Sequence, residues 1–214
     1  RSLEGELHNR AVTDPLTGLA NRQMFLQQLK QQFALSKRQS QLKMALLFID
    51  LDRFKLINDS LGHLSGDEVL KQSSQRISAC IRPGDTLARI GGDEFVLMLT
   101  DLSSADEVLP VTERILSAVA QQLDIAGQEL HITASIGISL MDSELSEPMQ
   151  MVQQADLAAG ALDDRRAHGR ARERPAPRAR RAGGQRLRAA SRRCAQAARR
   201  GRSADPRRQG RRGA

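Results

Sequence analysis

The chain has 214 residues, which is enough for one well-buried domain and an additional segment, and its net charge of +8 comes from two unlike parts. Residues 1–164 carry 14 Lys or Arg against 23 Asp or Glu, whereas residues 165–214 carry 19 Arg against 2 acids, so the overall charge does not describe the first part. Cys80 and Cys194 match no zinc or disulfide spacing, which favours a reducing compartment, and the longest apolar run, Met44 to Ile49, is too short to span a membrane.

Residues 1–13 place apolar side chains among charged ones at helical spacing, which predicts the end of an amphipathic helix that arrives from upstream. Because the chain begins with Arg1 rather than Met, we expect a piece of a longer protein. We expect it to be cytoplasmic, or to be the cytoplasmic part of a membrane-anchored sensor. Pro15 and Gly18 end the first helix, and Asn21 is expected to cap the next one.

Residues 43–49 form a continuous apolar run that ends in Asp50 and Asp52, as is typical of a central strand covered on both faces. We expect a loop over 53–63 and helices over about 67–81 and 105–123. Between these helices, two strands meet at Gly91-Gly92, because glycine tolerates the positive φ of a tight turn. Two further strands around Gly127 and a helix from Pro148 complete an α/β sandwich with a mixed sheet.

The apolar pattern ends at about residue 158, and from Arg165 onward Leu187 is the only large aliphatic residue. Such a segment buries too little apolar surface to offset its conformational entropy, so we expect residues 165–214 to be disordered on their own. One interpretation is an arginine-rich arm for nucleic acid or an anionic membrane. The interpretation that we favour is a GC-rich gene read out of frame.

Carboxylates stand at two predicted strand ends. Asp50 ends the central strand, and Asp93 and Glu94 follow the Gly91-Gly92 turn, so neighbouring strands would bring them together. Adjacent carboxylates repel unless a cation lies between them or one keeps its proton, and Mg²⁺ is the hard cation that suits oxygen ligands. Because Mg²⁺ also binds water and phosphate, the pattern points to phosphoryl or nucleotidyl transfer. Solvated loop acids are the alternative, and for Asp50 alone that alternative is favoured.

Several motifs occur in order and at a consistent spacing, and together they closely resemble the GGDEF domain of bacterial diguanylate cyclases over roughly residues 10–158. The resemblance implies a nucleotide-cyclase and polymerase-palm-like α/β fold, with helices around a mixed central sheet, and a domain over residues 14–164. The motifs are Asp14–Arg22, Phe48–His63, Gly66-Asp67, Gly91–Phe95 and Ser135–Ile138.

The resemblance implies that the domain condenses two GTP into cyclic di-GMP and two pyrophosphates. Two Mg²⁺ ions per active site, or Mn²⁺, would be held by Asp50, the carbonyl of Leu51 and Asp93. Asp93 or Glu94 would assist deprotonation of the attacking ribose 3′-OH. Asn58 and Asp67 would read guanine, and Lys55 and the backbone near Phe54 would hold the terminal phosphates. The substrate-binding set is therefore Phe54, Lys55, Asn58, Asp67, Gly91 and Gly92.

Each domain of this family binds one GTP, so the resemblance implies a homodimer of two-fold symmetry, paired by an upstream sensor domain through a signalling helix that ends in residues 1–13. Arg82 and Asp85 match the family's RxxD inhibitory site, where the product cyclic di-GMP binds and lowers activity. The other interpretation of these two residues is a helix end followed by a Pro-Gly turn. No specific nucleic-acid partner is expected.

The sequence departs from the family after Ala158. There the family continues with a Met-Tyr or similar pair, then Ala-Lys and Gly-Arg-Asn, whose basic side chains help to neutralise the triphosphate. Here Arg166 and Arg170 keep the four-residue separation but stand three positions late. Two hypotheses follow: a cyclase impaired at its C-terminal end, or a module without catalysis that binds GTP or cyclic di-GMP.

Overall fold

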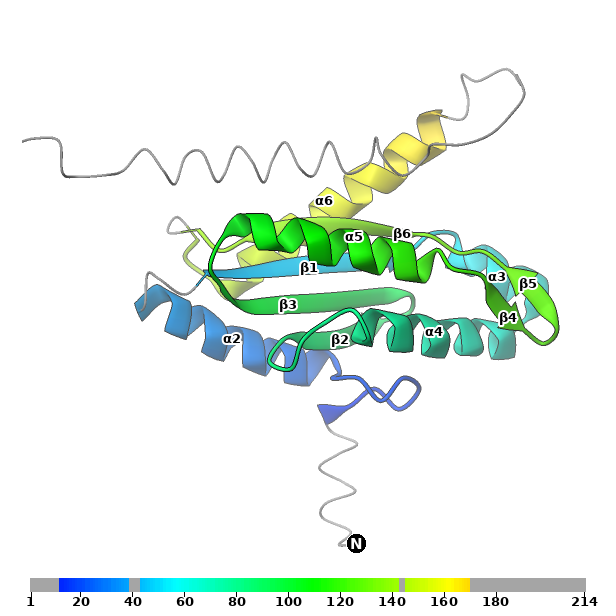
Figure 1. Cartoon of the computed structure of the whole chain (residues 1–214), viewed down its shortest axis with the longest axis horizontal. Helices are drawn as coiled ribbons and strands as arrows, with labels where there is room; N and C mark the ends of the chain where they lie inside the picture. Colours follow the sequence, from blue (N-terminus) through cyan, green and yellow to red (C-terminus); the bar gives the residue numbers. More distant parts are fainter. Residues whose placement is uncertain (1–11, 39–42, 143–144, 170–214) are drawn as a thin grey trace, which may run out of the picture. The chain divides into compact units, whose positions relative to one another are not determined.

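A four-stranded sheet forms the centre of the fold, with its strands in the order β2-β3-β1-β6 (Figure 1). The computed structural model describes residues 12–38, 43–142 and 145–169, and of residues 162–169 only the backbone. Residues 1–11 of the predicted helix over 1–13, and residues 170–214 of the predicted tail over 165–214, lie outside the described residues. The strands are β1 Lys43–Leu51, β2 Thr86–Gly91, β3 Glu94–Leu102 and β6 Ala134–Leu140.

The expected α/β fold class is confirmed. The sequence predicted a mixed sheet, but the neighbouring strands of this sheet all pair antiparallel. β1 pairs antiparallel with both β3 and β6, and β2 pairs antiparallel with β3. The helical crossover does return β2 parallel to β1. The hairpin that follows then places β3 between the two, so each of these three pairings is antiparallel.

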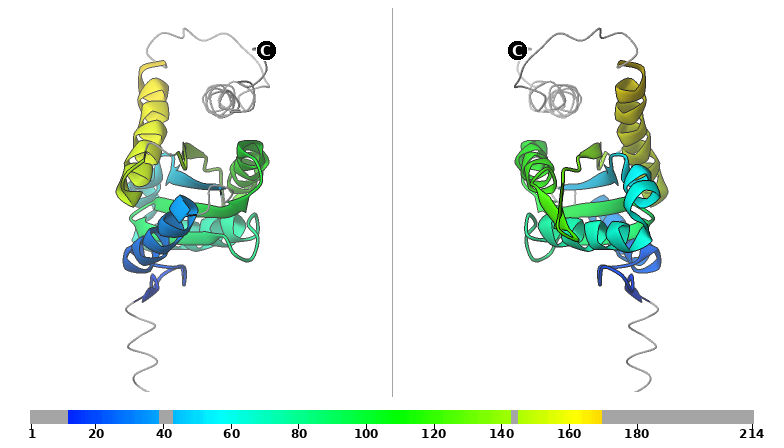
Figure 2. Two further views of the ribbon diagram at one scale, coloured as in Figure 1. Left: turned by 90° about the vertical axis from the view of Figure 1, so that its left-hand side faces the viewer. Right: turned by 90° about the vertical axis from the view of Figure 1, so that its right-hand side faces the viewer.

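The two faces of the sheet carry separate apolar cores, because successive side chains of a strand point to opposite faces. On β1, Leu47 and Ile49 pack with α4 and α5, whereas Leu46 and Phe48 pack with α2 and α6. The side views in Figure 2 show these helix pairs on opposite sides of the sheet. The helices are α2 Arg22–Arg38, α3 Phe54–Leu61, α4 His63–Ser78, η1 Ala105–Glu107, α5 Val108–Val119 and α6 Pro148–Gly169.

The segment after β1 is helical, so the prediction of a loop over 53–63 is wrong. Arg53 adopts a left-handed conformation with φ of 62°, which turns the chain sharply, and α3 starts at the next residue. Phe54 is buried and Ile57 packs against the same core one turn later, which anchors this short helix. A small hairpin also precedes β6, made of β4 Leu123–Ile125 and β5 Gln128–Leu130.

Helix α6 lies directly against β6 because Gly137 has no side chain. A methyl group at Gly137 would overlap backbone atoms of Ala155 and Ala159, both of which are buried. The buried face of this helix therefore continues to Ala159, and the helix itself reaches Gly169. Within the described ranges, the structure has no helix with the length and apolar character needed to cross a membrane.

Candidate active site

The ends of β1 and β3 bring the predicted carboxylates to one edge of the sheet. Asp50 lies directly opposite Glu94 of β3 and opposite Ser135 of β6. Glu94 is the first residue of β3, so Asp93 belongs to the turn rather than to the strand, and Gly92 supplies the positive φ of 52°. The Leu51 N–H donates to the Asp93 carbonyl at 3.3 Å, which holds the turn beside the end of β1.

The carbonyl of Leu51 faces the same side as this turn. The Asp52 N–H donates to the Thr133 carbonyl on the β6 side at 2.7 Å. In a trans peptide the N–H and the C=O point in opposite directions, and the described residues contain no cis peptide. The Leu51 carbonyl oxygen therefore points toward the β3 side of β1, where Asp93 lies.

These groups fit a hard divalent cation, because carboxylate and carbonyl oxygens are the ligands that Mg²⁺ prefers. Among the residues that the structure describes, no cluster of three or more Asp, Glu, His or Cys side chains could hold a metal ion by itself. A magnesium ion here would therefore complete its coordination with the Leu51 carbonyl, water and phosphate oxygens. Such a sparse protein ligand set is usual for magnesium bound together with a nucleotide.

The half-buried carboxyl of Glu94 has a raised pKa. Burial is the largest cause, followed by repulsion from the negative charges of Asp156 and Asp93, while the charge of Arg22 acts in the opposite direction. Asp156 comes from α6 and Arg22 begins α2, so both helices on this face contribute charge to the sheet edge. Neither residue was predicted as part of the site, because each is distant in sequence from the Gly-Gly turn.

Helix α3 begins right after the end of β1, and its N-terminus has no side-chain cap: Arg53 occupies the capping position without a capping hydrogen bond. The first amides of a helix have no partner within the helix, and together with the helix dipole they attract anions such as phosphate. Lys55 is exposed in this first turn, while Phe54 is buried beneath it.

Helices α3 and α4 bring Asn58 and Asp67 close together. Gly66 lies under the Asn58 side chain, and a methyl group at Gly66 would overlap its Oδ1 atom. A larger residue at Gly66 would therefore require the Asn58 side chain to turn away. Asp67 is the next residue, and both polar side chains are half-buried, which leaves them partly open to a ligand.

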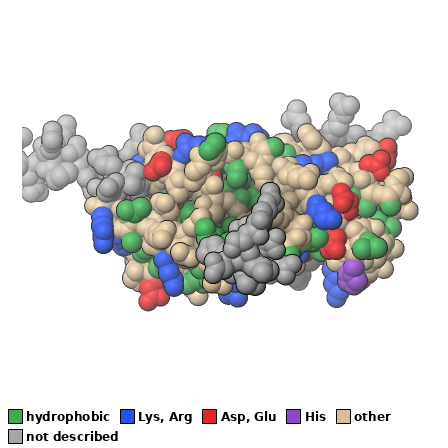
Figure 3. All heavy atoms as spheres, turned by 90° about the horizontal axis from the view of Figure 1, so that it is seen from below, with side chains coloured by type: hydrophobic (Ala, Val, Ile, Leu, Met, Phe, Trp, Pro, Cys, Tyr) green, Lys and Arg blue, Asp and Glu red, His purple; other side chains and the backbone are tan. Residues whose placement is uncertain are grey.

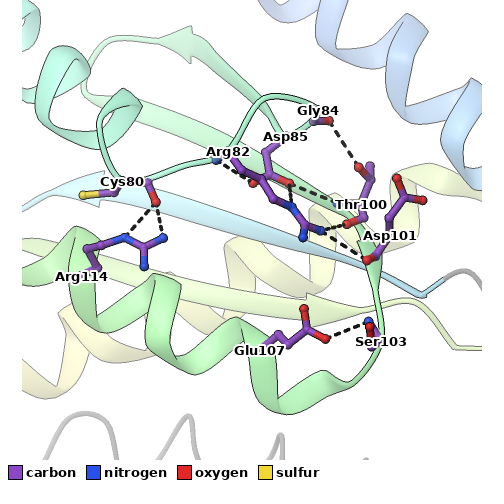
Figure 4. Close-up of polar contacts among 9 residues, drawn as sticks. All are labelled: Cys80, Arg82, Gly84, Asp85, Thr100, Asp101, Ser103, Glu107 and Arg114. Carbon is purple, nitrogen blue, oxygen red and sulfur yellow. Dashed lines mark hydrogen bonds and ion pairs between the residues drawn. The ribbon is translucent and has the colours of Figure 1, made fainter.

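Arg82 and Asp85 form a contact before β2 (Figure 4). The Arg82 Nε atom lies 3.6 Å from Asp85 Oδ1, and Arg82 Nη2 donates to the carbonyls of Thr100 at 2.5 Å and Asp101 at 3.3 Å. The Asp85 carboxylate also accepts the Arg82 N–H at 3.2 Å. The Arg82 side chain is 51% exposed and that of Asp85 only 3%, so the guanidinium faces solvent over a buried acid.

A small pocket adjoins this contact, and α5 contributes a second arginine to it. Arg114 Nε and Nη2 both donate to the Cys80 carbonyl, at 3.0 and 2.5 Å (Figure 4). Arg114 was not predicted as a site residue because nothing near it in the chain marks it; only the packing of α5 places it here. The pocket is lined by Arg82, Asp85, Leu99, Leu102, Glu107, Val111 and Arg114.

A second arginine–aspartate pair ties the loop before α2 to the Gly-Gly turn. Arg89 Nη1 lies 3.2 Å from both carboxylate oxygens of Asp14, and Nε and Nη2 donate to the Gly92 carbonyl at 2.9 and 2.8 Å. Burial alone would raise the pKa of Asp14, but hydrogen bonds from Thr17 and Arg89 and the positive charge of Arg89 outweigh it, so the pKa is lowered.

Comparison with known proteins assigns the chain to a family. A family model described as diguanylate cyclase, GGDEF domain, matches residues 11–170. This chain belongs to the GGDEF family. The match reaches residue 170, beyond the limit of about 158 that the sequence motifs predicted.

The GGDEF chain has relatives of much greater length. The probable diguanylate cyclase DgcE of Escherichia coli is 39% identical over 162 residues, which are 75% of this chain and 14% of DgcE. The diguanylate cyclase TpbB of Pseudomonas aeruginosa is 37% identical over 154 residues, which are 71% of this chain and 35% of TpbB. The chain therefore corresponds to a minor part of these relatives.

A solved GGDEF structure shares the fold. The crystal structure of the coiled coil and GGDEF domain of DgcB from Caulobacter crescentus, in complex with c-di-GMP, superposes with a TM-score of 0.70 at 27% identity. The superposition covers 78% of this chain and 86% of the DgcB chain.

The face of the present GGDEF domain seen from below in Figure 3 has basic and acidic side chains interspersed over its visible described surface.

The structure thus groups most of the predicted GGDEF site residues into two neighbouring sets. Asp50, Leu51, Asp93 and Glu94 lie at the sheet edge, and Asn58 and Asp67 lie in the α3–α4 pair. Asp52 lies beside the first set, but no role was predicted for it from the sequence. For Arg166 only the helical backbone is described, and Arg170 lies outside the described residues.

Proposed function

We propose that this chain is the catalytic domain of a diguanylate cyclase, which condenses two GTP into cyclic di-GMP and two pyrophosphates. One observation carries the proposal: the oxygen ligands of Asp50, Leu51 and the Asp93 turn lie at the sheet edge where α3 begins with an uncapped N-terminus. Cation ligands and an anion-binding helix end in one place suit a magnesium-bound triphosphate.

The residues that would hold two Mg²⁺ ions, or Mn²⁺ in their place, are Asp50, the Leu51 carbonyl and Asp93. When bound, these ions neutralise charge that develops on the phosphates and lower the pKa of a coordinated hydroxyl. Glu94 lies opposite Asp50, and its raised pKa makes its carboxylate a stronger proton acceptor than an ordinary glutamate. Asp93 or Glu94 would therefore take the proton of the attacking ribose 3′-OH.

The α3–α4 pair would bind the nucleotide itself. The first amides of α3 near Phe54, with Lys55, bind the terminal phosphates, and Gly91 and Gly92 leave the turn open to the substrate because neither carries a side chain. Asp67 accepts hydrogen bonds from the ring N–H and the amino group of guanine, as a carboxylate can. Asn58, whose side chain lies over Gly66, supplies the neighbouring polar contact.

Catalysis would need two such domains, since each holds one GTP and the product is two-fold symmetric. A homodimer with a two-fold axis provides this geometry, and an upstream sensor domain would control it. The product would also bind at Arg82 and Asp85, where a half-exposed guanidinium faces a pocket. The DgcB structure, which contains c-di-GMP, supports product binding within this family.

The second candidate function is a module that binds GTP or cyclic di-GMP but does not convert GTP into product. The observation that favours it is the altered sequence after Ala158, where Arg166 stands three positions late relative to the family pattern. Loss of the basic residues that neutralise the triphosphate would weaken catalysis while leaving the pocket at Arg82 unchanged.

The full chain incubated with GTP and Mg²⁺ distinguishes the two candidates. The cyclase is expected to release pyrophosphate and cyclic di-GMP, both lost in Asp93→Ala, whereas Asp59→Ala on the exposed side of α3 serves as the matched control. Nucleotide products are separated by chromatography and identified by mass. Binding of cyclic di-GMP without formation of any product at high protein concentration would favour the second candidate.

A further inference from the structure

Asp52 is a nearly buried acid that the proposed mechanism does not use. It follows β1 directly, two residues after Asp50, and only 9% of it is exposed. A buried carboxylate is costly unless hydrogen bonds compensate for its lost hydration, so its partners indicate why it is tolerated there.

Both carboxylate oxygens of Asp52 bind hydroxyl groups at the start of β6. Ser135 Oγ donates to Oδ1 at 2.8 Å, and Thr133 Oγ1 donates to Oδ2. The main chain adds a third link, because the Asp52 N–H donates to the Thr133 carbonyl at 2.7 Å. Asp52 is therefore fixed to β6 by its side chain and its backbone together.

These links turn the Asp52 side chain toward β6, whereas the Leu51 carbonyl points toward the Asp93 turn on the opposite side. Asp52 thus lies on the β6 side of the proposed metal site, and both of its oxygens have hydroxyl partners. The same peptide unit contains the Leu51 carbonyl and the Asp52 N–H, so fixing one fixes the direction of the other. The next residue, Arg53, has its φ in the left-handed region, which is strained for a residue with a side chain.

We propose that Asp52 is a positioning residue for the metal site: its tether to Thr133 and Ser135 holds the Leu51 carbonyl toward Asp93 and fixes the start of α3. The inference rests on the proposed cyclase function and deepens it. Outer hydrogen bonds that orient ligands typically change metal affinity by about 10–100-fold when they are removed. Without the side-chain links, only the Asp52 N–H bond to the Thr133 carbonyl restrains the Leu51–Asp52 peptide against relaxation of the strained turn at Arg53.

The test measures Mn²⁺ affinity by electron paramagnetic resonance, with 3′-deoxy-GTP present so that no reaction occurs. Asp52→Ala is expected to weaken Mn²⁺ binding by about tenfold or more. Asp52→Asn should stay within about threefold of the native chain, since an amide of the same shape still bonds both hydroxyls, which can accept as well as donate. Asp59→Asn, an exposed acid of α3, is the matched control and should bind Mn²⁺ like the native chain.

A structural role alone would lower the unfolding temperature of Asp52→Ala and leave its Mn²⁺ affinity unchanged, and that result overturns the inference. If Asp52→Ala does not fold, Thr133→Val replaces it, because this isosteric change removes one hydroxyl and leaves the acid in place. Unchanged Mn²⁺ affinity in Thr133→Val would then overturn the inference. A native chain that binds neither Mn²⁺ nor 3′-deoxy-GTP overturns the proposed function and this inference together, whereas native binding with unaffected variants overturns the inference only.

Discussion

Arginine–aspartate pairs lie at both ends of β2, and they differ in how far solvent reaches them. The side chains of Arg89 and Asp14 are 13% and 16% exposed, whereas Arg82 is 51% exposed over a buried Asp85. Arg89 uses Nε, Nη1 and Nη2 in hydrogen bonds to Asp14 and the Gly92 carbonyl. The same two residue types thus serve the fold at one end of the strand and present a charge to solvent at the other.

The difference in exposure distinguishes an ion pair that stabilises the fold from an ion pair that can bind a ligand. A nearly buried pair with both partners satisfied resists disruption, because removal of one partner leaves the other charge without compensation. A half-exposed guanidinium retains hydration that an anionic ligand can replace. Arg89 is expected to act mainly on stability and Arg82 mainly on product binding.

Arg89→Ala tests this contrast with the largest expected effect. It should lower the free energy of unfolding by about 3 kcal/mol, since Asp14 would remain nearly buried without its partner. Because the Gly92 carbonyl also loses its donors, the proposed cyclase activity should fall as well. Urea unfolding followed by circular dichroism measures the stability change. An Arg89→Ala loss no larger than that of Arg82→Ala would contradict the contrast.

Arg82→Ala should act in the opposite way. We expect the affinity for cyclic di-GMP to fall about tenfold or more, because charge-assisted hydrogen bonds to a charged ligand are worth about 1.5–3 kcal/mol. Stability should fall by less than in Arg89→Ala, because the backbone N–H groups of Arg82 and Thr100 still donate to the buried Asp85 carboxylate after the substitution. Isothermal titration with cyclic di-GMP measures the first quantity. Arg114→Ala gives a second variant of the same pocket, and equal binding in all three chains would refute a product site here.

Asp14→Asn sharpens the comparison through pH. The folded pKa of Asp14 is lowered from 3.8, so its stabilising contribution is present above that value and is lost as the pH falls through the folded pKa. We expect the variant to be about 1.5 kcal/mol less stable at pH 7. The difference from the native chain should shrink as the pH falls below 3.8. Urea midpoints across this pH range measure it, and a constant difference would be inconsistent with the pair.

Asp156→Asn extends the comparison to Glu94, an acid whose neighbouring charges are mostly negative. This substitution has the smallest expected effect. Removal of the Asp156 charge should lower the pKa of Glu94, although burial continues to raise it. The acid limb of the pH–rate profile should therefore move to lower pH, with kcat at pH 7.5 changed by less than about twofold, as expected for an exposed charge. A shift to higher pH would contradict the assignment of these charges.

Much of the fold was accessible from the sequence because several signals are local. Asn21 caps α2 as expected, with its Oδ1 accepting the Met24 N–H at 3.0 Å. The apolar run before Asp50 forms the central strand, and the Gly91-Gly92 pair forms the predicted hairpin. In each of these cases the residue that determines the structure stands within a few positions of it.

The missed features depend on contacts between distant segments. Helix α3 was predicted as a loop because its anchor is the burial of Phe54 under a strained turn at Arg53, which no local pattern reveals. Arg114 joins the Arg82 pocket only through the packing of α5. Asp52 has its hydroxyl partners on β6, far along the chain, so its sequence position beside Asp50 gave no indication of a tether.

The central place of β1 has a consequence for motion. This strand is hydrogen-bonded on both edges and covered on both faces, so its amides should be among the last to exchange with deuterium in the described domain. The Gly91-Gly92 turn projects from a hairpin and should open far more often. We therefore expect Asp50 to lie in the slowest-opening part of the domain and Asp93 in a faster-opening part, so the backbone hydrogen bonds in the two halves of the proposed metal site should open at different rates.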